Sequence, residues 1–223
     1  ILNFCDQIGI AKANSMVDVA QLEFCIRDDL NTKVPRVMCV LDPLKIVIEN
    51  YEGEEEIDAS YYPHDVPKVG SRKLPFSKEI YIERDDFMEE PPKKYFRLFP
   101  GNEVRLMNAY FVKCVDFEKD ENGKVTVVHC TYDPITKNGT GFTGRKVKGT
   151  IHWVSARHSL DAEVRLYDYM MEDQDYDKTN FLEKLNPNSK MILKGCKVEP
   201  TMKEHNVGDR FQFLRHGYFV IDQ

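Results

Sequence analysis

At 223 residues the chain can form one large domain or two small ones, and its 42% hydrophobic and 11% aromatic residues suffice for packed cores, which excludes a disordered tail. No run of about eighteen apolar residues occurs and no secretory signal opens the chain, so neither a membrane span nor export is predicted. The formal net charge of −6, taken as an average, argues against a nucleic-acid partner.

The first predicted element is a helical segment over residues 1–33, and because the chain opens almost directly into it, we expect a fragment of a longer protein. Apolar residues recur near helical spacing in this segment, and Asn14 or Ser15 is available as the cap. The helix is expected to end near Leu30, because Pro35 follows.

Beyond Pro35 the sequence favours strands. Seven segments are rich in β-branched and aromatic residues and are separated by Gly, Pro, Asn and Asp. They span residues 37–40, 45–48, 79–83, 103–116, 124–132, 145–155 and 211–222. This spacing predicts a mainly β fold of antiparallel strands, in barrels or sandwiches. Asn122-Gly123 predicts a hairpin with a type I′ turn, and residues 181–185 are expected to form a short helix.

The segment 144–156 alternates between apolar and polar residues like a strand and contains the only tryptophan. We expect Val147, Ile151 and Trp153 on a packed face. The other face is expected to meet water or an anion, and it carries Lys146, Lys148, Thr150 and His152.

Just before this segment, Gly139, Gly141 and Gly144 have the G-x-G-x-x-G spacing of a dinucleotide-binding turn. Such a turn needs a following helix whose amino end faces the phosphate, whereas a strand pattern follows here. A mobile hairpin is therefore the favoured interpretation.

Other catalytic and metal-binding patterns are missing from the sequence. The six cysteines form no C-x-x-C pair, so we expect neither zinc nor disulfides but reduced thiols in a cytoplasmic protein. The six histidines form no H-E-x-x-H motif, and no G-x-S-x-G motif provides a serine nucleophile. Adjacent acids such as Glu54-Glu55-Glu56 are typical of solvated loops rather than of general acid and base pairs.

Charge is segregated along the sequence. Residues 49–58 carry six acids and no base, and residues 161–177 carry seven acids and one base. Residues 93–113 instead carry five bases and one acid, and residues 137–158 carry five bases, histidines aside, and no acid. One surface is thus expected to attract phosphate. The alternative is that these basic residues only keep the exposed faces of strands solvated.

Four arginines lie at or near predicted strands, where a planar five-donor guanidinium can read a base edge or clamp a phosphate; they are Arg36, Arg97, Arg105 and Arg215. Each alone is also compatible with a packed surface arginine. Arg105 is expected on the strand face opposite its apolar neighbours. Gln212 and Arg215 lie three residues apart, so they reach one ligand only if the chain bends, and His216-Gly217 offers such a turn.

Together with the segment 144–156, several short motifs carry a family resemblance that extends over nearly the whole chain. They are Pro35-Arg36-Val37-Met38, Leu41-Asp42-Pro43-Leu44-Lys45, Gly101-Asn102-Glu103-Val104-Arg105-Leu106 and Glu163-Val164-Arg165-Leu166-Tyr167-Asp168. The chain resembles the carboxy-terminal region of the glutaminyl-tRNA synthetases. This resemblance implies two antiparallel β-barrels that grip the anticodon loop, preceded by the short helical segment. The implied barrels are residues 34–107 with 191–223, and residues 108–190.

The resemblance also implies which residues contact the anticodon loop of a tRNA. Carried over by motif, they are Asn31, Arg36, Lys94, Arg97, Arg105, Gln212 and Arg215. The family often has glutamine at the position of Lys94, arginine at Met107 and a basic residue at Phe96. Phe96 can instead stack on an unpaired base of single-stranded RNA.

In this family a separate catalytic domain attaches glutamine to its tRNA with ATP and magnesium. Neither of that domain's signatures, His-Ile-Gly-His and Lys-Met-Ser-Lys-Ser, occurs in this chain. We therefore expect no catalytic residue, metal site or cofactor here, with tRNA as the partner of a monomer and glutamine and ATP bound only by the missing domain. The alternatives are the same region of a related glutamyl-tRNA synthetase and a free-standing RNA-binding or protein-interaction module.

Overall fold

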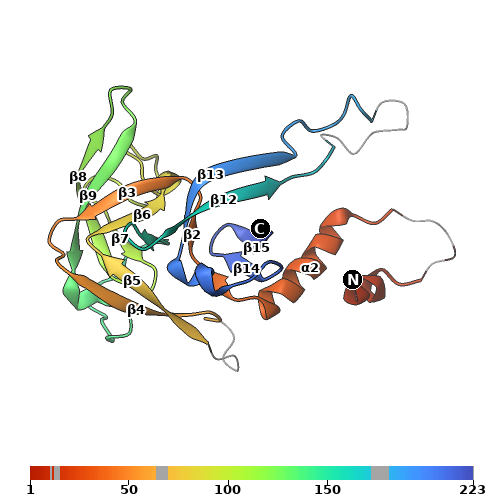
Figure 1. Ribbon diagram of the computed structural model, residues 1–223, viewed down its shortest axis with the longest axis horizontal. Helices are drawn as coiled ribbons and strands as arrows, with labels where there is room; N and C mark the ends of the chain where they lie inside the picture. The colour runs from red at the N-terminus through yellow and green to blue at the C-terminus, as the bar shows by residue number, and fades with distance from the viewer. Residues whose placement is uncertain (11, 13–15, 64–69, 172–180, 223) are drawn as a thin grey trace. The chain divides into compact units, whose positions relative to one another are not determined.

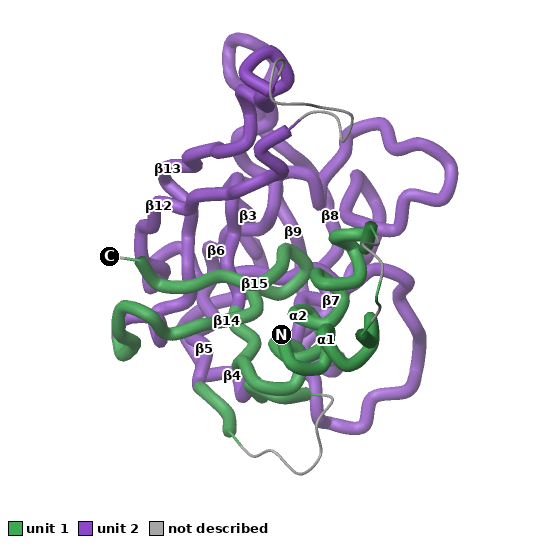
Figure 2. The backbone as a smooth tube through the Cα atoms, turned by 90° about the vertical axis from the view of Figure 1, so that its right-hand side faces the viewer, with its two compact units in different colours: residues 1–37, 60–72, 204–223 green, residues 38–59, 73–203 purple. Residues whose placement is uncertain are grey.

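The computed structural model describes residues 1–10, 12, 16–63, 70–171 and 181–222 (Figure 1). The chain divides into two compact units, drawn in green and purple in Figure 2. Unit 1 comprises residues 1–37, 60–72 and 204–223, and unit 2 comprises residues 38–59 and 73–203. The predicted mainly β fold is confirmed. The predicted division into two barrels, over 34–107 with 191–223 and over 108–190, stays a prediction.

Within its described residues, unit 1 contains two α-helices, α1 (Leu2–Ile8) and α2 (Val19–Lys33). The carboxylate of Asp18 caps α2 by accepting a hydrogen bond of 2.9 Å from the Ala20 amide, so the predicted cap was wrong; Asn14 and Ser15 lie outside the described residues. α2 also continues past Leu30. It ends where Val34 turns extended, because the residue before a proline is driven out of the helical region. No helix of the described chain has the length and apolar character that crossing a bilayer requires.

The sheet of unit 1 has three short strands, in the order β1 (Arg36–Val37), β14 (Arg210–Phe213) and β15 (Gly217–Val220). β1 runs parallel to β14, and β14 antiparallel to β15. The expected bend after Gln212 is present. It includes Arg215, which has a φ of 71°, and the His216 amide closes it by donating to the Phe213 carbonyl at 2.9 Å.

Unit 2 is built on a seven-stranded sheet. In spatial order its strands are β10 (Thr150–Ile151), β7 (Glu103–Leu106), β8 (Phe111–Lys119), β9 (Val125–Asp133), β3 (Pro43–Ile48), β6 (Glu79–Glu83) and β11 (Val154–Ser155). Its two edge strands, β10 and β11, are separated in the chain by only two residues. The sheet therefore curls. Three Cα–Cα steps join the end of β10 to the start of β11, so these two ends lie at most about 11 Å apart.

Five further strands occur in the described chain, and the sequence predicted only one of them. They are β12 (Leu160–Tyr167), β13 (Lys190–Val198) and β2 (Cys39–Val40), which form a three-stranded sheet, and the pair β4 (Glu54–Ser60) and β5 (Ser71–Ser77). Figure 1 shows β12 and β13 as a long two-stranded ribbon. The predicted short helix at 181–185 was wrong: Lys184 closes a turn onto Phe181, and Leu185 bridges to Met171.

Two predicted strands are interrupted. The segment 103–116 turns back at Asn108, whose φ is 60°, and becomes β7 and β8. The segment 145–155 is irregular up to Gly149 and then forms β10 and β11, with His152 and Trp153 between them. Strict alternation of the two faces therefore ends before His152.

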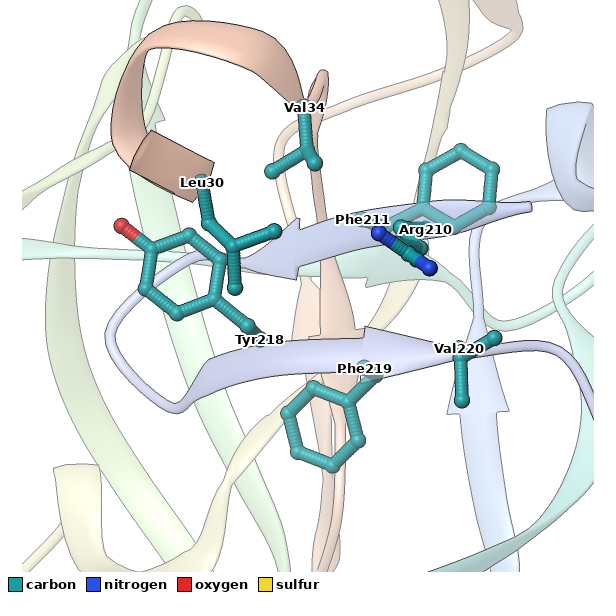
Figure 3. A pocket seen from close by; sticks show the side chains of 7 residues that line it. All are labelled: Leu30, Val34, Arg210, Phe211, Tyr218, Phe219 and Val220. Carbon is teal, nitrogen blue, oxygen red and sulfur yellow. The ribbon is translucent and has the colours of Figure 1, made fainter. Parts of the chain in front are cut away.

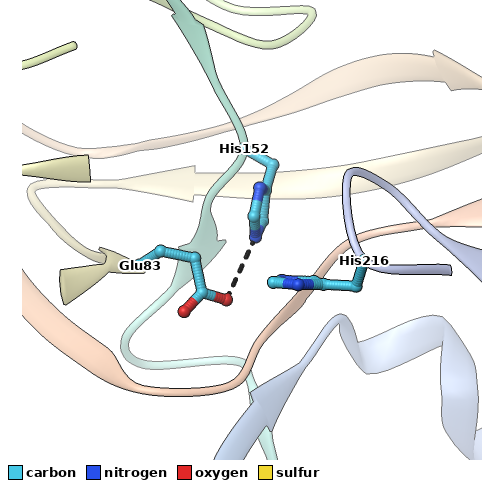
Figure 4. A group of neighbouring side chains, drawn as sticks. All are labelled: Glu83, His152 and His216. Atoms are coloured by element: carbon cyan, nitrogen blue, oxygen red, sulfur yellow. Dashed lines mark ion pairs between the residues drawn. The ribbon is translucent and has the colours of Figure 1, made fainter. Parts of the chain in front are cut away.

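Trp153 lies at the closure of the curled sheet and is 1% exposed, which confirms its predicted burial. Its indole nitrogen donates to the Met107 carbonyl at 2.9 Å, and its ring meets Phe76 edge to face with centroids 5.0 Å apart. His152 was expected on a wet face, but it is fully buried, with its Nε2 3.4 Å from Oε1 of Glu83 (Figure 4). The two-residue link between the edges buries both side chains.

The hairpin predicted at Asn122-Gly123 joins β8 to β9, but its turn is not type I′. That type needs positive φ at both central residues, and only Gly123 has it, at 78°. The Asp120 carboxylate instead accepts from the amides of Asn122 and Lys124, each at 2.9 Å. The side chain of Asp120 therefore stabilises this turn, and Asn122 does not adopt the left-handed conformation that type I′ requires.

Candidate nucleic-acid interface

The seven residues implied by the family resemblance fall into two groups. Unit 1 holds Asn31, Arg36, Gln212 and Arg215, and unit 2 holds Lys94, Arg97 and Arg105. Each group gathers residues that are far apart in the sequence. Strand pairing does so in unit 1. In unit 2, Gly149 lies against the loop that carries Lys94 and Arg97 and accepts a hydrogen bond from the Arg105 amide.

In unit 1, the last turn of α2 meets β1 through a hydrogen bond between two of the implied residues. Arg36 donates from Nη2 to the side-chain oxygen of Asn31 at 2.7 Å, and its residue is only 6% exposed. Within the described chain, Nε and Nη1 of Arg36 have no protein partner. The Asn31 contact thus fixes the guanidinium direction while it leaves donors for a ligand.

Gln212 lies beside Arg36, because the two are register partners in the parallel β1–β14 pair and so project from the same face. The buried side-chain oxygen of Gln212 accepts no hydrogen bond from any described residue. A buried unsatisfied acceptor is costly, by about 1–3 kcal/mol, unless a ligand or water supplies a donor. Arg215 is exposed in the turn that follows β14. Donors and an acceptor therefore share one small area.

A second feature of unit 1 is an apolar pocket between α2 and the β14–β15 hairpin (Figure 3). It is lined by Leu30, Val34, Arg210, Phe211, Tyr218, Phe219 and Val220. Ligand sites combine apolar walls with several convergent polar groups, and this pocket has few of them. We therefore do not assign it to the candidate interface.

In unit 2, Arg97 is held by the short 3-10 helix η1 (Arg84–Asp86). Its Nη1 donates to the Asp85 carbonyl at 3.1 Å, and its Nε lies 3.2 Å from the fully buried Asp86 carboxylate. The side chain is still 44% exposed, so the remaining guanidinium donors face solvent. Lys94 precedes it in the same loop, exposed, with a φ of 70°.

Arg105 lies on β7 between the buried Val104 and Leu106 and projects from the other face, as predicted. Its guanidinium carbon stands 4.3 Å from the ring centroid of Phe111, its register partner on β8. Burial lowers the pKa of Arg105, and its Nη1 is buried without a hydrogen-bond partner in the described chain. A stacked cation with an unused buried donor is well suited to a phosphate or base-edge acceptor.

The basic segment 137–158 contributes less free charge than its composition suggests. Lys137 pairs with Glu55, and Arg157 pairs with Glu54 at 2.6 Å. Arg145 makes a two-pronged contact with Glu103, at 2.6 and 2.8 Å, and a further one with Asp133 at 2.8 Å; these hydrogen bonds raise its pKa. Lys137 and Arg157 thus bind the segment to β4, and Arg145 binds it to the seven-stranded sheet, whereas Lys146 and Lys148 make no ion pair with a described residue.

Sequence reasoning missed the role of Gly149. A Cβ at this position would overlap the Phe96 carbonyl oxygen, so the loop that carries Arg97 lies directly against Gly149. The Gly149 carbonyl also accepts from the Arg105 amide at 2.9 Å. The available signal was a glycine inside an alternating pattern, which often marks a close backbone approach.

Comparisons with known proteins identify the family to which the chain belongs. Two models of one family, tRNA synthetases class I (E and Q), anti-codon binding domain, match residues 34–133 and 150–222. Among curated proteins, a glutamine–tRNA ligase of Clostridium perfringens is 58% identical over 100% of this chain and 41% of its own length. Those of Bradyrhizobium diazoefficiens and Clostridioides difficile are 54% and 52% identical, each over 99% of this chain and 40% of the relative.

The chain thus spans about 40% of the length of the curated relatives that it matches. The two family matches together cover all of its described strands, including β1, β7 and β14, which carry Arg36, Arg105 and Gln212. The chain belongs to the anticodon-binding domain family of the class I tRNA synthetases for glutamate and glutamine.

Proposed function

We propose that this chain is the anticodon-recognition region of a glutaminyl-tRNA synthetase and that it binds the anticodon loop of glutamine tRNA. The observation that carries the proposal is the buried Nη1 of Arg105, stacked on Phe111 and without an acceptor in the described chain. A buried donor that makes no hydrogen bond costs folding free energy, and RNA offers acceptors at every phosphate and base edge.

The choice of glutamine over glutamate rests on the third anticodon base, which is guanine in tRNAs for glutamine codons and cytosine in those for glutamate codons. Guanine presents the acceptors O6 and N7, whereas cytosine presents an amino donor that a guanidinium would repel. The family resemblance assigns Arg97 to this base, and its exposed donors and its contacts with Asp85 and Asp86 support that assignment.

The chemistry belongs to the rest of the parent enzyme. There a catalytic domain would bind glutamine, tRNA acceptor end and ATP with magnesium, and this chain would add no catalytic residue. We place the parent in the cytoplasm as a monomer. A glutamyl-tRNA synthetase is the nearest alternative, and the curated relatives named above, all glutamine–tRNA ligases, favour the glutaminyl assignment.

Titration of labelled glutamine tRNA with this chain, at several salt concentrations, tests the proposal. Phosphate contacts release counterions, so affinity should fall steeply as salt rises. Absence of binding at low salt, or binding that does not depend on salt, contradicts the proposal. The chain alone should form no adenylate from glutamine and ATP, and pyrophosphate exchange would overturn the assignment of catalysis to another domain.

A further inference from the structure

Phe96 is a large aromatic side chain left in solvent next to the proposed tRNA contacts. It is 47% exposed, whereas Phe111 and Trp153, two aromatic residues near β7, are 2% and 1% exposed. A single exposed phenylalanine is ordinary on a protein surface. Its significance depends on what surrounds it.

Two neighbours hold Phe96 and supplement its ring. The ammonium of Lys148 stands 4.9 Å from the ring centroid, a cation–π distance, and Lys148 makes no ion pair within the described chain. Gly149 presses on the Phe96 carbonyl and admits no larger residue. The backbone of Phe96 is therefore held in place, and a positive charge without an ion-pair partner in the described chain lies beside its ring.

The same loop is fixed on its other side. Asn102 donates to the Arg97 carbonyl at 2.7 Å, and the Leu98 amide donates to the Asp86 carbonyl at 2.9 Å. Phe96 therefore stands on a braced backbone, adjacent in sequence to Arg97. A pre-positioned ring loses little conformational freedom when it binds a flat ligand.

We propose that Phe96 is a stacking residue for an unpaired nucleobase of the anticodon loop, that Lys148 contacts that nucleotide's phosphate, and that Gly149 is a positioning residue for both. The inference rests on the proposed function. It follows from the chemistry of single-stranded RNA, whose exposed bases stack on aromatic faces while basic side chains follow the backbone.

The test uses the full-length synthetase and glutamine tRNAs that carry 2-aminopurine at single anticodon-loop positions. Stacking quenches the fluorescence of this base, so the synthetase without substitutions should quench 2-aminopurine at one of these positions. Phe96→Leu keeps the apolar bulk but removes the π face. We expect it to lose the quenching and to weaken binding roughly 5- to 150-fold, the range that stacking supplies, while Phe96→Trp retains both.

Matched variants separate stacking from folding. Phe181→Leu changes a phenylalanine of similar exposure, 44%, elsewhere in unit 2 and should alter neither quenching nor affinity. Lys148→Met should leave the quenching but reduce the salt dependence by about one phosphate contact. Gly149→Ala alone should lose the quenching, as Phe96→Leu does. The double variant should bind tRNA no more weakly than Gly149→Ala alone.

The outcomes distinguish this inference from the proposed function. A parent that binds tRNA with the expected salt dependence, combined with a Phe96→Leu variant of unchanged affinity and quenching, overturns the stacking role alone. A parent that does not bind tRNA overturns both. Unchanged quenching in Gly149→Ala, with Phe96→Leu affected, removes Gly149 from the proposal.

Discussion

Arg36 in unit 1 is oriented by a side-chain hydrogen bond, whereas Arg105 in unit 2 is oriented by stacking on an aromatic ring. The hydrogen bond from Arg36 to Asn31 consumes part of the guanidinium and gives it one direction. Stacking of Arg105 on Phe111 fixes the plane of the guanidinium but consumes no donor. The two arrangements therefore suit different tasks, since base reading needs a fixed direction and phosphate binding needs many free donors.

The supporting structure differs as well. Arg36 stands on a two-residue strand that pairs, among the described strands, with β14 alone, while Arg105 stands on β7 inside the seven-stranded sheet. The precision of Arg36 thus depends on a single neighbouring side chain, and that of Arg105 depends on the closure of the sheet. Variants can disturb each support separately.

The largest effect is expected from breaking the closure of the sheet. Trp153→Ala removes a buried ring between the edge strands β10 and β11, and large aromatic truncations of this kind cost about 3–5 kcal/mol of unfolding free energy. Urea unfolding of the isolated chain measures the loss. Ile135→Ala, at a position 63% exposed, is the control and should change little. Equal midpoints for the two variants would contradict the role of Trp153.

The sequence located the strands that are rich in β-branched and aromatic residues but missed β4, β5, β12 and β13. β3, β6 and β9 are rich in β-branched and aromatic residues, which a pleated sheet favours. β4 begins with three glutamates and β13 contains four lysine and glycine residues, and such residues are depleted in strands. Pairing within unit 2 outweighs these local preferences.

The candidate site could be predicted residue by residue but not as geometry. Motifs place Arg97 and Arg105, and alternation places Arg105 on its own face of β7. The contacts that hold them come from residues distant in sequence, such as Asp86 for Arg97. Lys137 and Arg145 look free in the sequence, but acids from other strands neutralise them. Only the folded chain brings those acids close.

The next largest effect is expected on tRNA discrimination in unit 2. Arg97→Ala in the full-length enzyme should reduce charging of glutamine tRNA by about 1–3 kcal/mol of transition-state stabilisation, or roughly 5- to 150-fold. A tRNA variant with cytosine as the third anticodon base should lose far less. Equal losses for both substrates would assign Arg97 to the RNA backbone or to the fold.

The role of Arg36 is tested by a substitution that keeps its positive charge and removes its planar guanidinium group. Arg36→Lys should weaken anticodon discrimination with little change in unfolding free energy, because a point charge cannot make the two-pronged contact. Asn31→Ala leaves the fork but releases its direction, and should cost discrimination by about 0.5–1.5 kcal/mol, the worth of one hydrogen bond. If each substitution has its full effect in the presence of the other, the Asn31 contact does not act through Arg36.

The smallest effect concerns pH and lies away from both groups. His129 on β9 is flanked by Glu118 and Glu49, each 2.8 Å from a ring nitrogen. The hydrogen bond with Glu118, followed by that with Glu49, raises the pKa of His129 above 6.5. The stabilisation is therefore complete below about pH 6.5 and disappears as pH rises through the folded-state pKa.

Because this triad lies at the surface, we expect it to contribute no more than about 1 kcal/mol. Unfolding free energy of the isolated chain, measured from pH 5.5 to 9, should fall by that amount, and His129→Gln should flatten this part of the profile. High salt should also reduce the difference, since partly exposed pairs are screened. If His129→Gln and the unsubstituted chain give the same pH profile, His129 contributes nothing to the pH dependence of stability.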